Sequence, residues 1–280
     1  MAYLAGMAAG PLILLALAAG LPAAFLIRAR MKSARRARLM TMRLSPETQA
    51  ALARHMPVYQ RLPEELRARL DGLIHRFLAE IRIYGADGLE VTQEMKTLIA
   101  AQACLLLVGH PERWYHSLRT IHLYPAGFES RIARHDGAVL TEKNEARSGE
   151  SWRYGPVILS WRDAAYGAAK PHDGRNVVYH EFAHQLDHET GVVDGAPLLD
   201  RSQSAVKWAH VMQAAFDRLR ADMAAGRESV LDAYGATSPA EFFAVATEHF
   251  FEQPEVMRAH LPALFGELRD YFNVDPSEWR

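Results

Sequence analysis

Apolar residues fill the start of the chain without interruption. No charged side chain occurs between Met1 and Ile27, and about 20 consecutive apolar residues are enough to cross the hydrocarbon core of a bilayer. The pattern therefore predicts a transmembrane anchor over residues 1–30, followed by a basic juxtamembrane segment over residues 31–45. A cleaved signal peptide is the alternative, but it would carry its positive charge before the apolar run rather than after it.

Helical spacing of apolar residues begins after this segment and is interrupted only in the middle of the chain. Helices are expected over residues 46–56, 63–81 and 91–109. Short runs rich in β-branched and aromatic residues then predict strands at 120–125, 138–140 and 157–161. From Asn176 the helical spacing returns and holds nearly to the C-terminus. This order of helices, a few strands and more helices predicts one α+β domain over residues 46–280 rather than a doubly wound fold.

Charge changes this picture only at the N-terminal end. The whole chain carries 32 basic and 33 acidic residues, so no global field indicates a nucleic-acid partner. From Arg28 to Arg43, however, there are several basic residues and no acidic one. The positive-inside rule keeps such a segment in the cytoplasm. We therefore expect a single-pass protein of the cytoplasmic (inner) membrane, with the lipid bilayer as a partner and the domain inside the cell.

The stretch HEFAH at residues 180–184 carries the candidate chemistry. In a helix, residues four apart lie about 6 Å apart along one face, so His180 and His184 can share one metal ion. Glu181 is turned about 100° from His180, which sets its carboxylate beside the ion, where it can take a proton from a bound water. Two imidazoles and an adjacent base are typical of a zinc-dependent hydrolase.

Two further polar residues follow in the same helix, for which Asn176 is the expected N-cap. His188 lies about 12 Å along the axis from His180, too far for both to reach one tetrahedral ion. We therefore expect His188 near the helix end and not as a ligand. Asp187, one turn after His184, could either orient a ligand or be an ordinary solvated residue.

The third ligand should come from a later helix that presents a carboxylate to the site. Ser238 and Pro239 predict the start of a helix that runs to about Glu252. Glu241 lies in its first turn, and Glu248, seven residues on, lies on nearly the same face. An acid among so many apolar residues must be paired, protonated or metal-bound. The residues alone leave both Glu241 and Glu248 open as the third ligand.

Five motifs in this order resemble the Mlc titration factor A family of zinc-dependent peptidases, which are gluzincin-like zincins. The motifs are YPAGF at 124–128, GESWRYGPVILSW at 149–161, HEFAHQLD at 180–187, DAY at 232–234 and SPAEFFAV at 238–245. The resemblance implies a zincin-like metallopeptidase domain with a small mixed sheet, an active-site helix that carries HExxH, and a helical C-terminal half.

The resemblance also implies roles for individual residues. Its zinc ligands, for a single Zn²⁺ ion, would be His180, His184 and Glu241. Glu181 would be the general base, and Glu248 an acid that supports a ligand. Tyr234 would lie near the metal, where its hydroxyl could donate a hydrogen bond to the oxyanion that forms from the substrate carbonyl.

An edge strand beside the active-site helix accepts the substrate backbone in zincins, as an added strand. The resemblance therefore makes Val157–Trp161 the candidate for this edge strand. An ordinary core strand is the alternative for the same residues.

Two functions follow from these observations. The first is a zinc-dependent metallopeptidase acting on peptide or protein substrates, with aminopeptidase and endopeptidase activity both open. The second is a membrane-tethered regulatory binding protein whose structural zinc helps it to sequester a transcriptional regulator, since the family is linked to binding a repressor of the glucose phosphotransferase system. A structural zinc site is usually closed by four protein ligands. Three are expected here, which favours the enzyme, and no direct contact with nucleic acid is expected.

Overall fold

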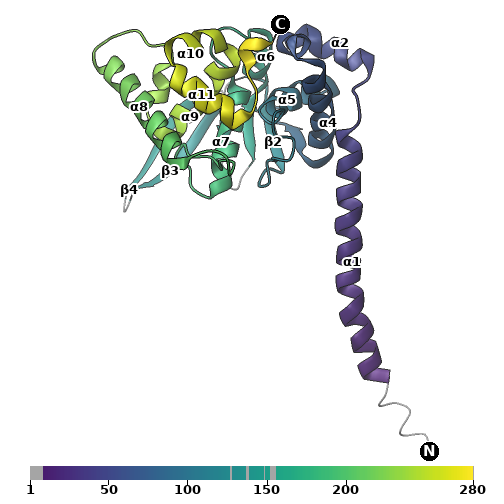
Figure 1. Ribbon diagram of the computed structural model, residues 1–280. Coiled ribbons are helices and arrows are strands. Elements are labelled where there is room, and N and C mark those ends of the chain that lie inside the picture. Colours follow the sequence, from purple (N-terminus) through teal and green to yellow (C-terminus); the bar gives the residue numbers. More distant parts are fainter. Residues whose placement is uncertain (1–8, 127, 137–138, 148, 152–155, 280) are drawn as a thin grey trace, which may run out of the picture.

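A long first helix extends away from the other elements in the computed structural model, which describes residues 9–126, 128–136, 139–147, 149–151 and 156–279. This helix is α1 (Ala9–Met40), and the remaining elements pack together at its C-terminal end (Figure 1). There α1 packs against α4 (Glu64–Glu80). Arg36 donates hydrogen bonds of 2.6 and 2.8 Å to the two carboxylate oxygens of Glu80, which fastens the two helices together.

The predicted transmembrane anchor over residues 1–30 is wrong for the part of the chain that the structure describes. None of the helices in that part is both long and apolar enough to cross a bilayer. The prediction rested on an apolar run that starts at Met1, but residues 1–8 lie outside the described residues, and α1 continues from Arg28 into the basic segment. The predicted location, which requires a single pass through the inner membrane to hold the domain on the cytoplasmic side, is contradicted by this finding, and the bilayer has no support as a partner.

The helices that precede β2 agree with the apolar spacing. They are α2 (Pro46–His55), α3 (Pro57–Arg61), α4 and α5 (Gln93–Leu105). The hydroxyl of Ser45 accepts the backbone N–H of Thr48 at 3.3 Å and so caps α2, which begins at Pro46 as predicted. The third predicted helix is shorter than expected, because α5 ends at Leu105 and the chain turns before Gly109.

A small mixed sheet of four strands has the order β1-β2-β6-β5. Its strands are β1 (Arg82–Gly85), β2 (Thr120–Tyr124), β5 (Gly149–Ser151) and β6 (Val157–Ser160). Strands β1, β2 and β6 are parallel. Their residues Ile83, Ile121 and Val157 lie in register and are buried together. No βαβ unit was expected, but β1, α5 and β2 form one. The sequence did not indicate it because β1 is too short to give a strand pattern. The fold is nevertheless helix-rich α+β.

The strand at Val157–Ser160 lies inside this sheet, between β2 and β5. Of the two interpretations of residues 157–161, the edge strand is therefore wrong and the interior strand is right. Among the described residues the outer strand on that side is β5, which pairs antiparallel with β6. Trp161 already begins the next helix, α6 (Trp161–Ala169).

A separate antiparallel hairpin is formed by β3 (Phe128–Asp136) and β4 (Val139–Arg147). The strand predicted at 138–140 corresponds to the start of β4. Its first residue, Ala138, lies outside the described residues.

Helices build the C-terminal half, as predicted. They are α7 (Val177–Asp187), α8 (Ala205–Ala224), α9 (Pro239–Glu252), α10 (Pro254–His260) and α11 (Pro262–Phe272), with 3₁₀ turns η1 (His188–Thr190), η2 (Ala233–Ala236) and η3 (Pro276–Glu278). Helix α7 lies between the α8 to α11 group and the α4 and α5 group (Figure 1). It packs against α9 on one side and against α5, α6, β5 and β6 on others. The helix that carries HExxH is thus held on nearly every side by the core.

Candidate metal centre

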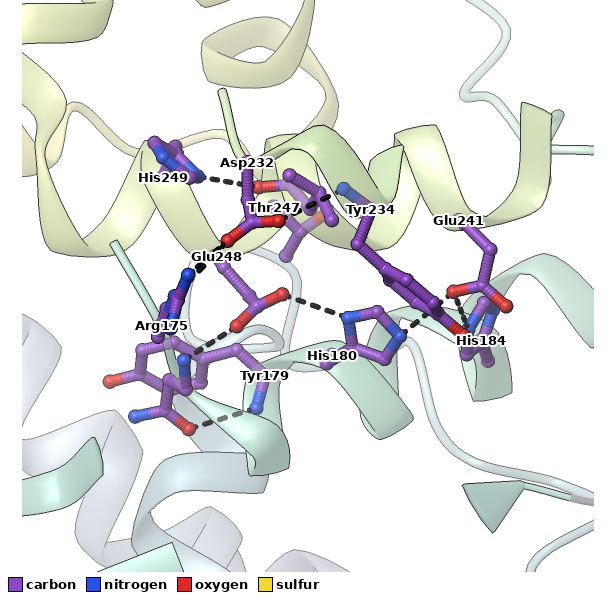
Figure 2. A network of polar contacts seen from close by, with 12 residues as sticks. Arg175, Tyr179, His180, His184, Asp232, Tyr234, Glu241, Thr247, Glu248 and His249 are labelled. Carbon is purple, nitrogen blue, oxygen red and sulfur yellow. Dashed lines mark hydrogen bonds and ion pairs between the residues drawn. The ribbon is translucent and has the colours of Figure 1, made fainter. Parts of the chain in front are cut away.

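The start of helix α7 is fixed by its N-cap. The side-chain oxygen of Asn176 accepts the backbone N–H groups of Val178 and Tyr179, both at 3.1 Å, which confirms the predicted cap. The helix then carries His180 and His184 on the face directed toward α9 (Figure 2). Their ring centroids are 4.9 Å apart, as expected for residues one turn apart on one face.

Helix α9 brings a carboxylate to this face from its first turn. The hydroxyl of Ser238 accepts the backbone N–H of Glu241 at 3.2 Å, and Pro239 is the first helical residue. Because α9 packs against α7, the side chain of Glu241 lies over the two histidines (Figure 2). One nitrogen of each of His180 and His184 and one oxygen of Glu241 lie within 4.8 Å of one another. We call these three side chains the ligand cluster.

The donor atoms of the ligand cluster have the chemistry and the spacing that zinc requires. Glu241 Oε2 lies 3.0 Å from His180 Nε2 and 3.3 Å from His184 Nε2. Ligand atoms about 2.0 to 2.1 Å from a tetrahedral zinc ion lie about 3.3 Å from each other. Two imidazole nitrogens and a carboxylate oxygen also suit zinc among the common divalent ions. The residues present therefore fit a metal ion, most simply zinc.

Glu248 lies on the other side of the His180 ring. Its Oε1 is 2.8 Å from His180 Nδ1, and its Oε2 accepts the backbone N–H of Asn176 at 2.6 Å. Both of its oxygens are engaged in this way, whereas Glu241 faces the Nε2 atoms of the two histidines. Of the two acids that the sequence left open, the structure brings Glu241 into the ligand cluster and Glu248 to the ring nitrogen behind it.

Charges in the ligand cluster are strongly coupled. Burial by itself lowers the pKa of His180, but the hydrogen-bonded carboxylates of Glu241 and Glu248 outweigh it and raise that pKa well above its ordinary value. Burial raises the pKa of Glu241, but its hydrogen bonds with the two imidazoles outweigh this effect and lower it. Positive charge between these groups is thus favoured, whether a proton or a metal ion supplies it.

The two predicted catalytic side chains both lie near the ligand cluster. Glu181 follows His180 in α7 and is buried, with 4% of its surface exposed. Tyr234 comes from η2, and its ring centroid is 5.9 Å from that of His180. Figure 2 shows the Tyr234 side chain extending from η2 toward Glu241 and His184. Only the family resemblance indicated Tyr234, because on local sequence it is an aromatic residue in a turn.

Asp187 and His188 have other positions. Asp187 is fully buried and accepts the backbone N–H of Gly195 at 2.9 Å, so the interpretation as a solvated helix residue is wrong. Burial raises the pKa of this carboxyl to about 6. His188 begins η1 after the end of α7. Within the described ranges it is not among the residues that gather as candidate ligands.

A network of buried polar side chains lies behind the N-cap of α7, and no local sequence pattern indicates it. The side-chain N–H₂ of Asn176 donates to Gln102 at 3.0 Å and to Glu252 at 3.2 Å. Burial, together with the negative charges of Asp173 and Glu248, raises the pKa of Glu252 to about 9, although the hydrogen bond from Asn176 opposes the shift. Glu252 is therefore a neutral acid at pH 7. The partners are 74 and 76 residues away from Asn176, which is why no local pattern indicates them.

Comparison with known proteins gives one family. The sequence profile described as glucose-regulated metallo-peptidase M90 matches residues 30–273. An uncharacterised protein of Synechocystis sp. is 37% identical over 235 residues, which cover 83% of this chain and 86% of that protein.

Two similar relatives carry the name Mlc titration factor A. The protein from Klebsiella pneumoniae is 34% identical over 227 residues, covering 79% of this chain and 84% of its own length. The protein from Salmonella arizonae is 32% identical over 229 residues, covering 80% of this chain and 89% of its own length.

Proposed function

Because the chain belongs to the glucose-regulated metallo-peptidase M90 family, which includes the Mlc titration factor A proteins, we propose that it is a zinc-dependent peptidase. The observation that carries this proposal is the ligand cluster, in which two Nε2 atoms and one carboxylate oxygen converge, with Glu181 next to His180 in the same helix. We propose His180, His184 and Glu241 as the zinc ligands of a zincin-like domain. The substrate would be a peptide or protein.

Zinc, when bound, supplies a Lewis acid that makes a water molecule acidic and polarises a peptide carbonyl. The residues of the chain would do the rest. The carboxylate of Glu181 would accept the proton of the attacking water and deliver it to the leaving amine nitrogen. The Tyr234 hydroxyl would donate a hydrogen bond to the carbonyl oxygen as negative charge develops there. Glu248 would hold Nδ1 of His180, which leaves Nε2 directed at the metal position.

We propose the edge of β5 as the place where the substrate backbone binds. An extended peptide can add to an exposed sheet edge through main-chain hydrogen bonds. Two observations support β5 in this role. It is the outer strand of the four-stranded sheet, and it packs against α7. A peptide on this edge would run alongside the helix that carries the general base.

A regulatory binding protein with a structural zinc is the second candidate. The relatives named Mlc titration factor A suggest that this chain, too, interacts with a regulator. A closed structural site would need a fourth protein ligand. Glu248 is poorly suited to that part, because both of its oxygens already have partners in His180 and Asn176. The three-residue ligand cluster therefore supports the peptidase, and binding of a regulator would be an additional property.

Substitution of the general base tests the proposed reaction. We expect Glu181→Gln to leave one zinc ion per chain and to reduce hydrolysis of a denatured protein and of amino-terminal chromogenic substrates at least a hundredfold. Metal analysis and turnover should be measured on the same preparation. Turnover unchanged in Glu181→Gln would contradict the mechanism, and wild-type protein that binds zinc but hydrolyses neither class of substrate would favour the binding protein.

A further inference from the structure

An ion pair joins the segment before α7 to the turn that carries Tyr234. Both Nε and Nη2 of Arg175 donate to Oδ2 of Asp232, at 3.1 and 2.6 Å. The other oxygen of Asp232, Oδ1, accepts the backbone N–H of Tyr234 at 2.9 Å. Asp232 thus divides its carboxylate between the backbone of Tyr234 and the guanidinium of Arg175 (Figure 2). The partners are 57 residues apart in the sequence.

The backbone beside Arg175 is hydrogen-bonded to neighbouring elements, whereas the Arg175 side chain itself is 73% exposed. The N–H of Asn176, the next residue, is bonded to Glu248, and the carbonyl of His172 accepts a hydrogen bond from Gln253 at 2.8 Å. Between them, Gly174 has a φ of +79°, and a Cβ at this position would lie 2.8 Å from Nε2 of His249. Two hydrogen bonds, to Glu248 in α9 and to Gln253 at its C-cap, therefore tie the segment 172–176 to this helix.

The Tyr234 end of the pair is the turn η2, which packs against α8 and α9. Nearly half of the Tyr234 surface, 48%, is exposed, and its ring centroid lies 5.9 Å from that of His180. Turn η2 has only four residues, and Gly235 is its buried member. The electrostatics agree with a pair that is formed in the folded chain. Burial raises the pKa of Asp232, but the Tyr234 N–H and the Arg175 guanidinium outweigh it and lower that pKa overall.

We propose that the Arg175–Asp232 ion pair is the device that positions Tyr234 over the ligand cluster. Arg175 and Asp232 are positioning residues, since they act through Tyr234 rather than on the substrate. The pair connects η2 to the same segment that begins α7, so the position of the tyrosine is set relative to His180. This inference rests on the proposed function for its catalytic consequence, but not for its structural one.

The kinetic test removes each half of the pair. Arg175→Met keeps an unbranched side chain close in length to the aliphatic part of arginine but removes its charge. Asp232→Asn keeps an oxygen that can accept the Tyr234 N–H. We expect each variant to lower kcat about tenfold and to change KM less than twofold. The loss should be smaller than the hundredfold or greater decrease in kcat that follows complete removal of an oxyanion donor, because the Tyr234 hydroxyl is still present. Arg175→Lys, which keeps the charge, should recover most of the activity. Unchanged kcat in both Arg175→Met and Asp232→Asn would overturn the proposal.

Combining Arg175→Met with Tyr234→Phe tests whether the ion pair acts through Tyr234. In Tyr234→Phe we expect Arg175→Met to cause no further loss of kcat, because the hydroxyl that the pair positions is already absent. An equal loss in both backgrounds would mean that Arg175 acts elsewhere and would overturn the proposal. Arg69→Met, which removes an exposed arginine paired with Glu65 on α4, is the matched control and should leave kcat unchanged.

Hydrogen exchange tests the structural part without any catalysis. The amides of Tyr234, Gly235 and Thr237 close η2 through hydrogen bonds of 2.9 to 3.1 Å. We expect a peptide over residues 231–238 to exchange at least fivefold faster in Arg175→Met than in the wild type or in Arg69→Met. Exchange that does not change would overturn the proposal. If the wild type lacks peptidase activity while this exchange accelerates as expected, the proposed function fails and the structural role of the pair stands.

Discussion

Glu248 lies 2.8 Å from Nδ1 of His180, and the opposite ring nitrogen, Nε2, faces Glu241 at 3.0 Å. The same carboxylate accepts the backbone N–H of Asn176, the N-cap of α7. One acid from α9 therefore fixes both the start of the helix and the orientation of its first histidine. This relationship gives the first of four predictions.

Removal of Glu248 should weaken zinc binding. We expect Glu248→Ala to raise the Kd for zinc about 10- to 100-fold, as is usual when the carboxylate partner of a ligating histidine is lost. Glu248→Gln should raise the Kd for zinc by a smaller factor, because its amide oxygen can still accept a hydrogen bond. Titration against a competing chelator measures both, with the exposed Glu228→Ala as a control. Equal zinc affinity in Glu248→Ala and the wild type would show that the contact does not orient the ring of a zinc ligand.

Zinc removal should lower the thermal stability of the chain. A ligand that binds only the native state at a thousand times its Kd adds about 4 kcal/mol to the free energy of unfolding. For a chain of this size that corresponds to a shift in Tm on the order of 10 °C. We expect a chelator to lower Tm by about this amount in the wild type and by little in Glu241→Ala. Calorimetry with and without chelator checks both, and an equal drop in the two proteins would exclude Glu241 as a ligand.

Replacement of Glu252 should change how stability depends on pH. Its pKa is about 9 in the folded chain, against about 4.3 for an unperturbed Glu. Below pH 4 both states bind the proton and the group contributes nothing. As pH rises from there toward 9, the unfolded state ionises while the native state stays protonated, so stability is lost, by about 3 to 4 kcal/mol at pH 7.

Glu252→Gln keeps an oxygen for the N–H₂ of Asn176 and cannot ionise. We therefore expect it to be more stable than the wild type, with a gain that is small at pH 5 and grows toward pH 8.5. Urea denaturation at the two pH values measures this difference, and Glu255→Gln on the exposed surface of α10 is the control. A gain that does not increase with pH would mean that Glu252 is ionised in the folded chain.

The close approach of α1 to α4 depends on a missing side chain. A Cβ at Gly72 would lie 2.2 Å from the carbonyl oxygen of Met40, so we expect Gly72→Ala to lower the free energy of unfolding by about 1 to 3 kcal/mol. Gly266→Ala in α11 is the matched control, because a Cβ there has no neighbour within 4 Å. It should stabilise the chain by up to about 1 kcal/mol through helix propensity alone. Urea denaturation of both variants decides whether the helices are packed this closely.

Local sequence patterns were sufficient to predict features that depend on residues within one or two helical turns of each other. The caps at Asn176 and Ser238 are single side chains that bond to the next turn, and each is found as predicted. The placement of His180 and His184 on one face follows from helix geometry alone. These features need no knowledge of what the helices pack against.

Features that depend on long-range packing could not be predicted in the same way. Glu241 and Glu248 lie on nearly the same face of α9, so only the approach of α9 to α7 decides which of them meets the Nε2 atoms. Strand β5 has three residues and no periodicity to detect. The N-terminal prediction failed because it counted apolar residues over 1–30, whereas α1 joins part of that run to a basic segment in a single helix.

The ligand cluster draws on two helices that are made at different times. His180 and His184 enter the chain 57 residues or more before Glu241, and α9 follows most of the protein during synthesis. A growing chain that still lacks α9 has two donor groups, and it also lacks the acid that orients the first of them. A zinc site made of all three side chains would therefore form only after α9 has been synthesised and has packed against α7.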